Sequence, residues 1–314
     1  MTVGSRAGGF RGLAPFGEED ATLWRGREAE TAELLQRASD SRTPVLLTGE
    51  PGSGKTSLIL AGLLPAARQA RLLPIYLEGA LDWRWQFHQQ MARLGGELPA
   101  PRTDAHRLLD EHLAARQLKP LLILDHVEQL IWAEERAIDP LRQLVARLRA
   151  LSECRLVIAV DRGHLHALEP LSTDLDGLAE ARTVNLERLA ADAAGALIEQ
   201  TVLGGGGYIE DGLPLTIAEE LCADGPVLPA TLQMVGHAAA LRGATRAKTY
   251  HRAGGAWVLA QTYVATLARR AGGWRTRRLL SAFADQANPR ALLRLDELAR
   301  LAGMTDDEAQ RKLA

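Results

Sequence analysis

The sequence has few cysteines, few lysines and no long apolar run. Two cysteines occur among the 314 residues, at Cys154 and Cys222, and both lie in apolar segments. This usage gives no support to a disulfide framework or a zinc site and favours a reducing compartment, so we expect a soluble cytoplasmic protein. The opening stretch MTVGSRAGGFRG lacks the apolar core of a signal peptide, and no apolar run is long enough to span a bilayer.

A large excess of charge of either sign is also absent, since the formal net charge is −2. Neither nucleic acid nor an anionic membrane would therefore attract the chain as a whole. Positive charge is carried almost wholly by arginine, and lysine occurs only at Lys55, Lys119, Lys248 and Lys312. A lysine inside a phosphate-binding pattern is thus less easily explained by chance.

Apolar stretches and helical periodicities alternate over the first part of the chain. Strands are expected over residues 45–48, 73–77, 121–124, 156–160 and 183–186, and helices over 28–39, 55–70, 83–94, 104–117 and 139–151. Continuous apolar strands separated by helices indicate an α/β fold, a parallel sheet with helices on both faces. We place this domain at residues 28–187, after an irregular N-terminal segment at 1–27.

No strand pattern follows residue 187. Helices are expected over residues 191–202, 216–222 and 229–242, which predicts a small helical domain at 188–245. Residues 243–256 have the composition of a mobile connector. A helix over 257–271 and a helix-turn-helix-like ending then predict a winged-helix-like unit at 246–314, and we expect this unit to be truncated.

The strongest chemical signal is the sequence GEPGSGKT, which follows a predicted buried strand and precedes a predicted helix. It matches the phosphate-loop pattern G-x-x-x-x-G-K-[ST], whose glycines let backbone amides surround phosphate groups. Lys55 supplies a charge for the β- and γ-phosphates, and Thr56 supplies a hydroxyl for Mg²⁺. The expected ligands are therefore ATP or ADP with Mg²⁺. The predicted phosphate-binding residues are Gly49, Pro51, Gly52, Ser53, Gly54, Lys55, Thr56 and Ser57.

The second signal is LLILDHVEQL, an apolar strand that ends at Asp125. An acid at this point is typical of a residue that holds Mg²⁺ through water. Glu128 is a candidate for polarising the attacking water, and Gln129 for orienting it. The alternative is structural, with Asp125 capping the strand end and Glu128 as a solvated charge.

Two weaker signals follow. Arg162, after the fourth predicted strand, is a candidate for contacting the γ-phosphate, although a surface arginine at a strand end is an equal alternative. An arginine cluster at 269–278 is a candidate for nucleic-acid contact. The last predicted helix begins with Thr305-Asp306-Asp307-Glu308, however, and such carboxylates would repel DNA phosphates at the position where recognition helices approach.

The segment FRGLAPFGEEDATLWRGREAETAELL, followed by LLTGEPGSGKTSLILAGLLPAAR, resembles the novel STAND NTPases, bacterial signal-transduction ATPases related to AAA+ proteins. The resemblance implies that Gly26 and Arg27 lie against the base and sugar. It also implies that Pro229, in a lid motif at 225–229, packs near adenine. The family often has an arginine at the end of the fourth strand, where this chain has Asp161 with Arg162 next.

The resemblance implies an ATP-binding switch of a signalling NTPase, of a kind used in bacterial defence, in which the helical domain and the winged unit close over the nucleotide. Hydrolysis would be slow and Mg²⁺-dependent, and the ATP state would form a homo-oligomer. A sensor or effector domain is expected beyond residue 314 or in a partner protein, with no membrane or nucleic-acid partner. Two alternatives stay open: an AAA-like DNA-binding ATPase and a nucleotide-binding scaffold without hydrolysis.

Overall fold

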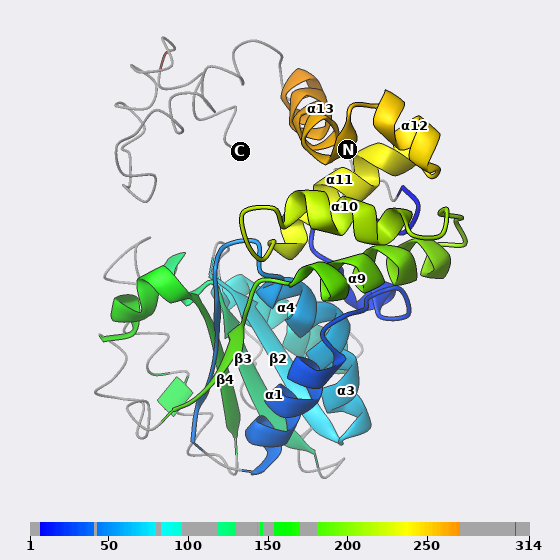
Figure 1. Cartoon of the computed structure of the whole chain (residues 1–314). Helices are drawn as coiled ribbons and strands as arrows, with labels where there is room; N and C mark the ends of the chain where they lie inside the picture. Colours follow the sequence, from blue (N-terminus) through cyan, green and yellow to red (C-terminus); the bar gives the residue numbers. More distant parts are fainter. Residues whose placement is uncertain are drawn as a thin grey trace.

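The computed structural model describes residues 7–40, 43–79, 83–95, 118–129, 154–169 and 181–270, together with positions 143, 145, 146 and 305. The helix predicted over 104–117 lies outside these residues, as do nearly all of the helix predicted over 139–151 and of the helix-turn-helix-like ending. Two units are described, a sheet with its helices and an all-helical unit that packs above one edge of the sheet (Figure 1).

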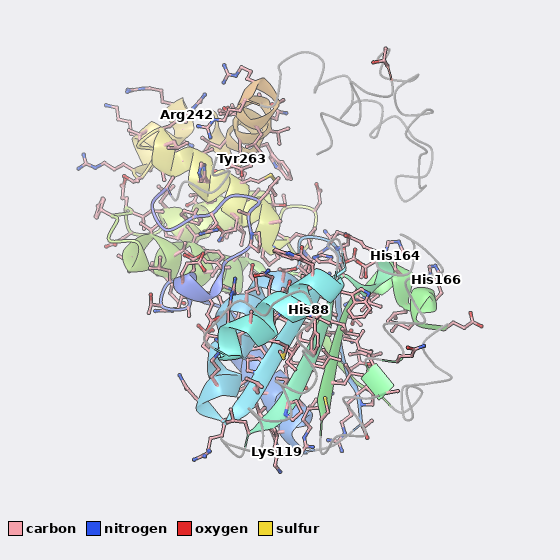
Figure 2. The ribbon with its side chains drawn as sticks, turned by 180° about the vertical axis from the view of Figure 1, so that it is seen from behind. His88, Lys119, His164, His166, Arg242 and Tyr263 are labelled. Carbon is pink, nitrogen blue, oxygen red and sulfur yellow. The ribbon has the colours of Figure 1, made fainter. Side chains whose placement is uncertain are left out.

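All five predicted strands are present in one sheet. They are β1 (Val45–Gly49), β2 (Leu72–Glu78), β3 (Lys119–Asp125), β4 (Arg155–Asp161) and β5 (Arg182–Leu186). Their order is β2-β3-β4-β1-β5, and every pairing is parallel. The carboxyl ends of the strands therefore share one edge, which faces the helical unit. Lys119, at the amino end of β3, lies at the opposite edge (Figure 2).

Helices cover both faces of the sheet because successive strand residues point to opposite sides. Leu47 and Ile123 face α1 and the helical run after the phosphate loop, whereas Leu122 and Ile158 face α4. The predicted α/β fold class is thereby confirmed. The elements around the sheet are η1 (Glu18–Asp20), α1 (Glu28–Asp40), α2 (Lys55–Ser57), the π-helical η2 (Leu58–Leu63), α3 (Leu64–Gln69), α4 (Trp83–Gly95) and the 3-10 helix η3 (Arg162–Leu168).

The helical unit has its own hydrophobic core. It consists of α9 (Ala191–Gly204), α10 (Leu213–Leu221), α11 (Pro229–Leu241), α12 (Ala247–Arg252) and α13 (Gly255–Arg270). Leu232 on α11 and Leu259 on α13 belong to the same buried cluster as Ile198 on α9. None of the helices described combines the length and the apolar character that crossing a membrane requires.

The prediction of a mobile connector over residues 243–256 is wrong, because this segment contains α12 and packs into the core of the helical unit. Tyr250 is 0% exposed, and its hydroxyl donates a hydrogen bond to the Glu220 carboxylate on α10. The same carboxylate accepts a hydrogen bond from the Ala256 amide at 3.0 Å, at the start of α13. The polar composition of the segment gave no sign of these contacts. The boundary placed at residue 246 stays a prediction, although α13 shares its core with α11.

The N-terminal segment joins the two units, and it runs from the helical unit down to α1 (Figure 1, dark blue). Phe10 is 2% exposed and lies in the core of the helical unit. The Arg11 amide donates to Gln233 Oε1 on α11 at 2.9 Å. Farther along, the Phe16 amide donates to Ser57 Oγ at 3.1 Å, at the helix that follows the phosphate loop. The segment therefore contacts both sides of the boundary between sheet and helices.

Gly236, in the middle of α11, is where the Phe10 ring packs most closely, since an added Cβ would lie 2.3 Å from Phe10 Cε1. Alanine normally stabilises a helix interior relative to glycine by about 0.5–1 kcal/mol. We expect Gly236→Ala to lower the free energy of unfolding by about 1–3 kcal/mol instead, because overpacking dominates. Chemical denaturation measures the change.

A second background separates the ring contact from general damage to α11. In a Phe10→Ala protein the ring is gone, so Gly236→Ala should there be neutral or stabilising. An equal destabilisation in both backgrounds would contradict the contact as the cause.

Candidate nucleotide-binding site

The carboxyl ends of the strands bring the polar residues of the site together. Parallel pairing places Gly49 opposite Asp161 and Glu78 opposite Asp125. A cavity of about 490 Å³ lies at this edge, where open α/β sheets bind their ligands. It is lined by the N-terminal segment (Gly12–Phe16, Trp24, Arg25, Arg27), the phosphate loop (Pro51–Ser57), strand-end residues (Glu78, His126, Gln129, Asp161) and the helical unit (Leu197, Thr201, Pro229, Ala230, Gln233).

The phosphate loop has the backbone of an anion cradle. Gly52 and Gly54 adopt φ values of 82° and 95°, a left-handed region that favours glycine. A Cβ at Gly49 would lie 2.5 Å from Ser53 Oγ, so the loop could not close over a larger residue. Ser53 Oγ is buried beside the cavity and has no hydrogen-bond partner among the described residues. An open cradle with an orphaned hydroxyl fits a bound phosphate group.

Lys55 is 5% exposed, and its ammonium group already has three partners. It donates to the carbonyl oxygens of Gly49 and Glu50, both at 3.2 Å, and to Asp161 Oδ1 at 2.5 Å. Asp161 therefore holds the ammonium group that the pattern assigns to the β- and γ-phosphates. From the sequence, Asp161 is only a departure from the family pattern and has no predicted role.

The residues predicted to hold Mg²⁺ lie beside His126. Thr56 Oγ1 is 3.1 Å from His126 Nε2, and the His126 amide donates to Asp125 Oδ1 at 3.0 Å. Asp125 is 0% exposed, and its Oδ2 accepts a hydrogen bond from the Tyr76 hydroxyl at 3.0 Å. Burial, followed by the nearby Asp125 charge, raises the pKa of Tyr76 and keeps its proton in place.

The oxygen donors of this corner fit Mg²⁺, which commonly takes one or two protein ligands together with phosphates and water. Within the described part of the chain, no group of three or more histidine, cysteine or carboxylate side chains could hold a metal by itself. Asp125 does not line the cavity directly, which accords with contact through water.

Glu128 is 2% exposed and lies behind His126, with its Oε1 3.5 Å from His126 Nδ1. This hydrogen bond raises the pKa of His126 to about 8, against the effect of burial. Burial opposes ionisation of Glu128, but the hydrogen bond and charge of His126 together with backbone hydrogen bonds outweigh it, and the pKa of Glu128 falls. Glu128 is thus ionised at neutral pH. Its Oε2 is buried and has no hydrogen-bond partner among the described residues.

Arg162 forms an ion pair beside the cavity wall and does not line the cavity. Its Nη2 lies 2.6 Å from Glu187 Oε1. The γ-phosphate contact stays a prediction that requires this ion pair to open. His164 and His166 follow on η3, with ring centroids 6.1 Å apart, beyond the carboxyl end of β4 (Figure 2).

The residues assigned to the base and sugar lie at the junction with the helical unit. Arg27 is 8% exposed, lines the cavity and donates to the Glu187 carbonyl. Gly26 has a φ of 84° and lies next to it without lining the cavity. Pro229 lines the cavity at the start of α11, and the next residue, Ala230, donates its amide to the Gly52 carbonyl at 3.1 Å.

Sequence reasoning missed several residues of the lining. Trp24, three residues before Arg27, and Leu197 on α9 both line the cavity although neither was singled out from the sequence. A Cβ at Gly62 would lie 2.7 Å from Trp24 Cζ3, so the small residue in η2 allows this close approach.

The contact between Lys55 and Asp161 predicts a preference among nucleotides. Asp161→Asn removes the negative charge and keeps the shape, so we expect tighter nucleotide binding and a larger gain for ATP than for ADP. A gain of about 10-fold for ATP corresponds to about 1.4 kcal/mol. Calorimetric titration with ADP and a non-hydrolysable ATP analogue measures both. Glu33→Gln, which neutralises a 45% exposed carboxylate on α1 outside the cavity, should leave both affinities within about 2-fold. Equal gains for the two nucleotides would contradict the assignment.

Comparison with known proteins agrees with this geometry. The Aeropyrum pernix ORC1 protein in complex with DNA has 15% identity and a TM-score of 0.55, covering 91% of this chain and 81% of that chain. A Walker-type ATPase of Pyrococcus abyssi has 16% identity and a TM-score of 0.53, covering 96% and 92%. Cdc6p from Pyrobaculum aerophilum has 16% identity and a TM-score of 0.51, covering 94% and 88%. These identities support a shared fold alone.

No curated protein matches the chain, but a family model does. The model described as Novel STAND NTPase 1 matches residues 9–312, almost the full length. The match includes the N-terminal segment, the phosphate loop and the helical unit. With its strand–loop–helix cradle at the edge of a five-stranded parallel sheet, the chain is a nucleotide-binding P-loop NTPase that belongs to the Novel STAND NTPase 1 family.

Proposed function

We propose that the chain is an ATP-dependent switch, in which the nucleotide sets how the helical unit packs against the sheet. The hydrogen bond from the Ala230 amide to the Gly52 carbonyl, 3.1 Å long, carries the proposal. It ties the first turn of α11 directly to the phosphate loop. A phosphate that reorganises the loop must therefore also act on α11 and the core behind it.

The N-terminal segment supports the same coupling. It lines the cavity through Leu13 and Phe16 and is anchored in the helical unit by Phe10. The cavity thus has walls from three parts of the chain. A ligand that fills it would stabilise one arrangement of these parts over others, in proportion to its preference for that arrangement.

In the proposed mechanism, Mg²⁺ would screen the charge of the phosphates, with Thr56 and Asp125 as the residues that hold it. Lys55 leaves Asp161 and binds the β- and γ-phosphate oxygens, while Arg27 and Pro229 contact the sugar and base. Glu128 polarises the attacking water. Its carboxylate must first leave the position behind His126, and this need for rearrangement supports slow hydrolysis.

The switch predicts different assembly states with different nucleotides. With Mg²⁺ and a non-hydrolysable ATP analogue, size-exclusion chromatography with light scattering should detect a homo-oligomer, whereas ADP should favour the monomer. Phosphate release should be far slower than the 1–10³ s⁻¹ usual for enzymes. One mass with both nucleotides, while calorimetry shows that both bind, would contradict nucleotide-controlled assembly.

A DNA-binding ATPase is the second candidate, because one similar structure is that of an ORC1 protein in complex with DNA. The described part of the chain offers Arg269 and Arg270 at the end of α13, and both are exposed. The predicted contacts at Arg277 and Arg278 lie outside the described residues. Salt-sensitive gel shifts that are lost on replacing these two arginines would favour this candidate over the switch.

A further inference from the structure

A second cavity, of about 240 Å³, opens on the surface of the helical unit between α11 and α13. The residues that line it and those that line the nucleotide cavity form separate sets among the described residues. Tyr263 and Arg242, two of its lining residues, both lie in the helical unit away from the sheet (Figure 2). The proposed switch uses none of the polar groups that face this cavity.

The lining of the second cavity is cationic. It includes Arg242, Arg269 and Arg270 and contains no carboxylate, in a protein whose formal net charge is −2. Within the described parts of the chain, none of these three guanidinium groups is in an ion pair. Arg269 Nη2 donates to Thr266 Oγ1 at 3.3 Å, which places a hydroxyl beside the charge. Such a concentration of unneutralised arginine favours an anionic ligand.

Apart from Thr262, the rest of the lining is apolar or aromatic. Leu241 and Leu267 contribute aliphatic side chains, and the ring of Tyr263 stands against the ring of His237 with centroids 5.2 Å apart. Guanidinium forks match phosphate oxygens, and a phosphate monoester carries nearly two negative charges at neutral pH. A ligand with a phosphate at one end and an aromatic or aliphatic body at the other fits both parts of the cavity.

The cavity is connected to the nucleotide site by two routes. The first turn of α11 supplies Pro229 and Gln233 to the nucleotide cavity, and the last turns of the same helix line the second cavity. The Tyr263 hydroxyl accepts a hydrogen bond from the Leu13 amide at 2.9 Å, and Leu13 also lines the nucleotide cavity. A Cβ at Gly12 would lie 2.0 Å from the Tyr263 hydroxyl oxygen, so this contact is close-packed.

We infer that the second cavity is an effector site for a small organic phosphate monoester, whose binding changes the affinity of the nucleotide site. Coupling between sites is reciprocal, so the nucleotide must change the affinity of the effector by the same factor. The effector role rests on the proposed switch, whereas occupation of the cavity does not. The two are therefore tested separately.

The probe is phenyl phosphate, which has a phosphate and one aromatic ring. Calorimetric titration into protein saturated with Mg²⁺ and ADP keeps the probe out of the phosphate loop. We expect saturable one-to-one binding with a dissociation constant below about 10 mM.

Three variants test which residues bind the probe. The double substitution Arg242→Gln, Arg269→Gln should weaken binding of phenyl phosphate by at least about 10-fold. Thr266→Leu, which keeps the arginines and fills space, should weaken it as well. Arg252→Gln, at an exposed arginine on α12 outside the cavity, is the matched control and should change nothing.

Phenyl phosphate should also change the affinity for ADP by about 5-fold or more in the wild-type protein, and not in the double variant. No saturable binding, or binding that the arginine and Thr266→Leu substitutions leave unchanged, would overturn the site. Binding without any change in ADP affinity would overturn the effector role. Repeating the titration in Lys55→Ala protein without nucleotide separates the two proposals, because the second cavity should still bind there even if the nucleotide assignment fails.

Discussion

Replacing Lys55 by alanine should lower the affinity for ATP by at least about 100-fold, or about 2.7 kcal/mol. The ammonium group is 5% exposed and is the positive partner of Asp161, which lines the same cavity. Its removal deletes a phosphate contact and leaves a carboxylate facing the phosphates without compensation, and both changes oppose binding. Calorimetric titration with ATP and Mg²⁺ measures the loss.

Two companion variants make the Lys55→Ala result specific. Lys248→Ala removes an exposed lysine on α12 and should leave the affinity unchanged. The double variant Lys55→Ala, Asp161→Ala should recover part of the loss, since the uncompensated charge is gone. Unchanged ATP affinity in the Lys55→Ala protein would remove the phosphate loop from the binding site.

Glu128→Gln should retain ATP binding within a few fold and lower the rate of hydrolysis by about 100-fold or more, the usual contribution of a general base. The reason is that glutamine keeps the size of the side chain but cannot accept the proton of the attacking water. Glu128 is ionised at neutral pH, because its pKa is lowered, and its Oε2 has no hydrogen-bond partner among the described residues, so this oxygen is available to accept a proton. Single-turnover phosphate release measures the effect.

Gln129 provides the comparison for Glu128. It lines the cavity directly, so Gln129→Ala should lower hydrolysis less than Glu128→Gln if its part is only to orient the water. Hydrolysis at the wild-type rate in the Glu128→Gln protein would exclude Glu128 from the mechanism. In that case the carboxylate serves the buried pair with His126 alone.

The sheet and the phosphate loop could be predicted because their signals are local. The strands β1 to β4 are mainly apolar stretches, and the loop is a contiguous motif between a strand and a helix. The position of Asp125 could be predicted for the same reason. It ends a buried strand, and the carboxyl ends of parallel strands lie at one edge of the sheet. The predicted ligand roles of Thr56 and Asp125 stay predictions. The structure places both beside His126, to which no role was assigned from the sequence.

The remaining features depend on contacts between distant residues. Whether Asp161 or Arg162 faces the phosphates depends on the pairing of β4 with β1, which places Asp161 beside Gly49. Residues 243–256 were predicted to be a connector from their polar composition. The hydrogen bond that holds them in the core joins Tyr250 to Glu220, 30 residues away, and no local pattern indicates it. The contact of Leu13 with Tyr263 spans 250 residues and has no pattern in the sequence.

The central claim is that the phosphates in the cavity control the packing of α11 on the phosphate loop. Amide hydrogen exchange of Ala230, whose N–H bonds to the Gly52 carbonyl, tests it most directly. Measured without nucleotide, with ADP and with a non-hydrolysable ATP analogue, the protection of this amide and of the rest of α11 should differ between the two nucleotides. The same protection in both bound states, with calorimetry confirming that both nucleotides bind, would contradict the claim.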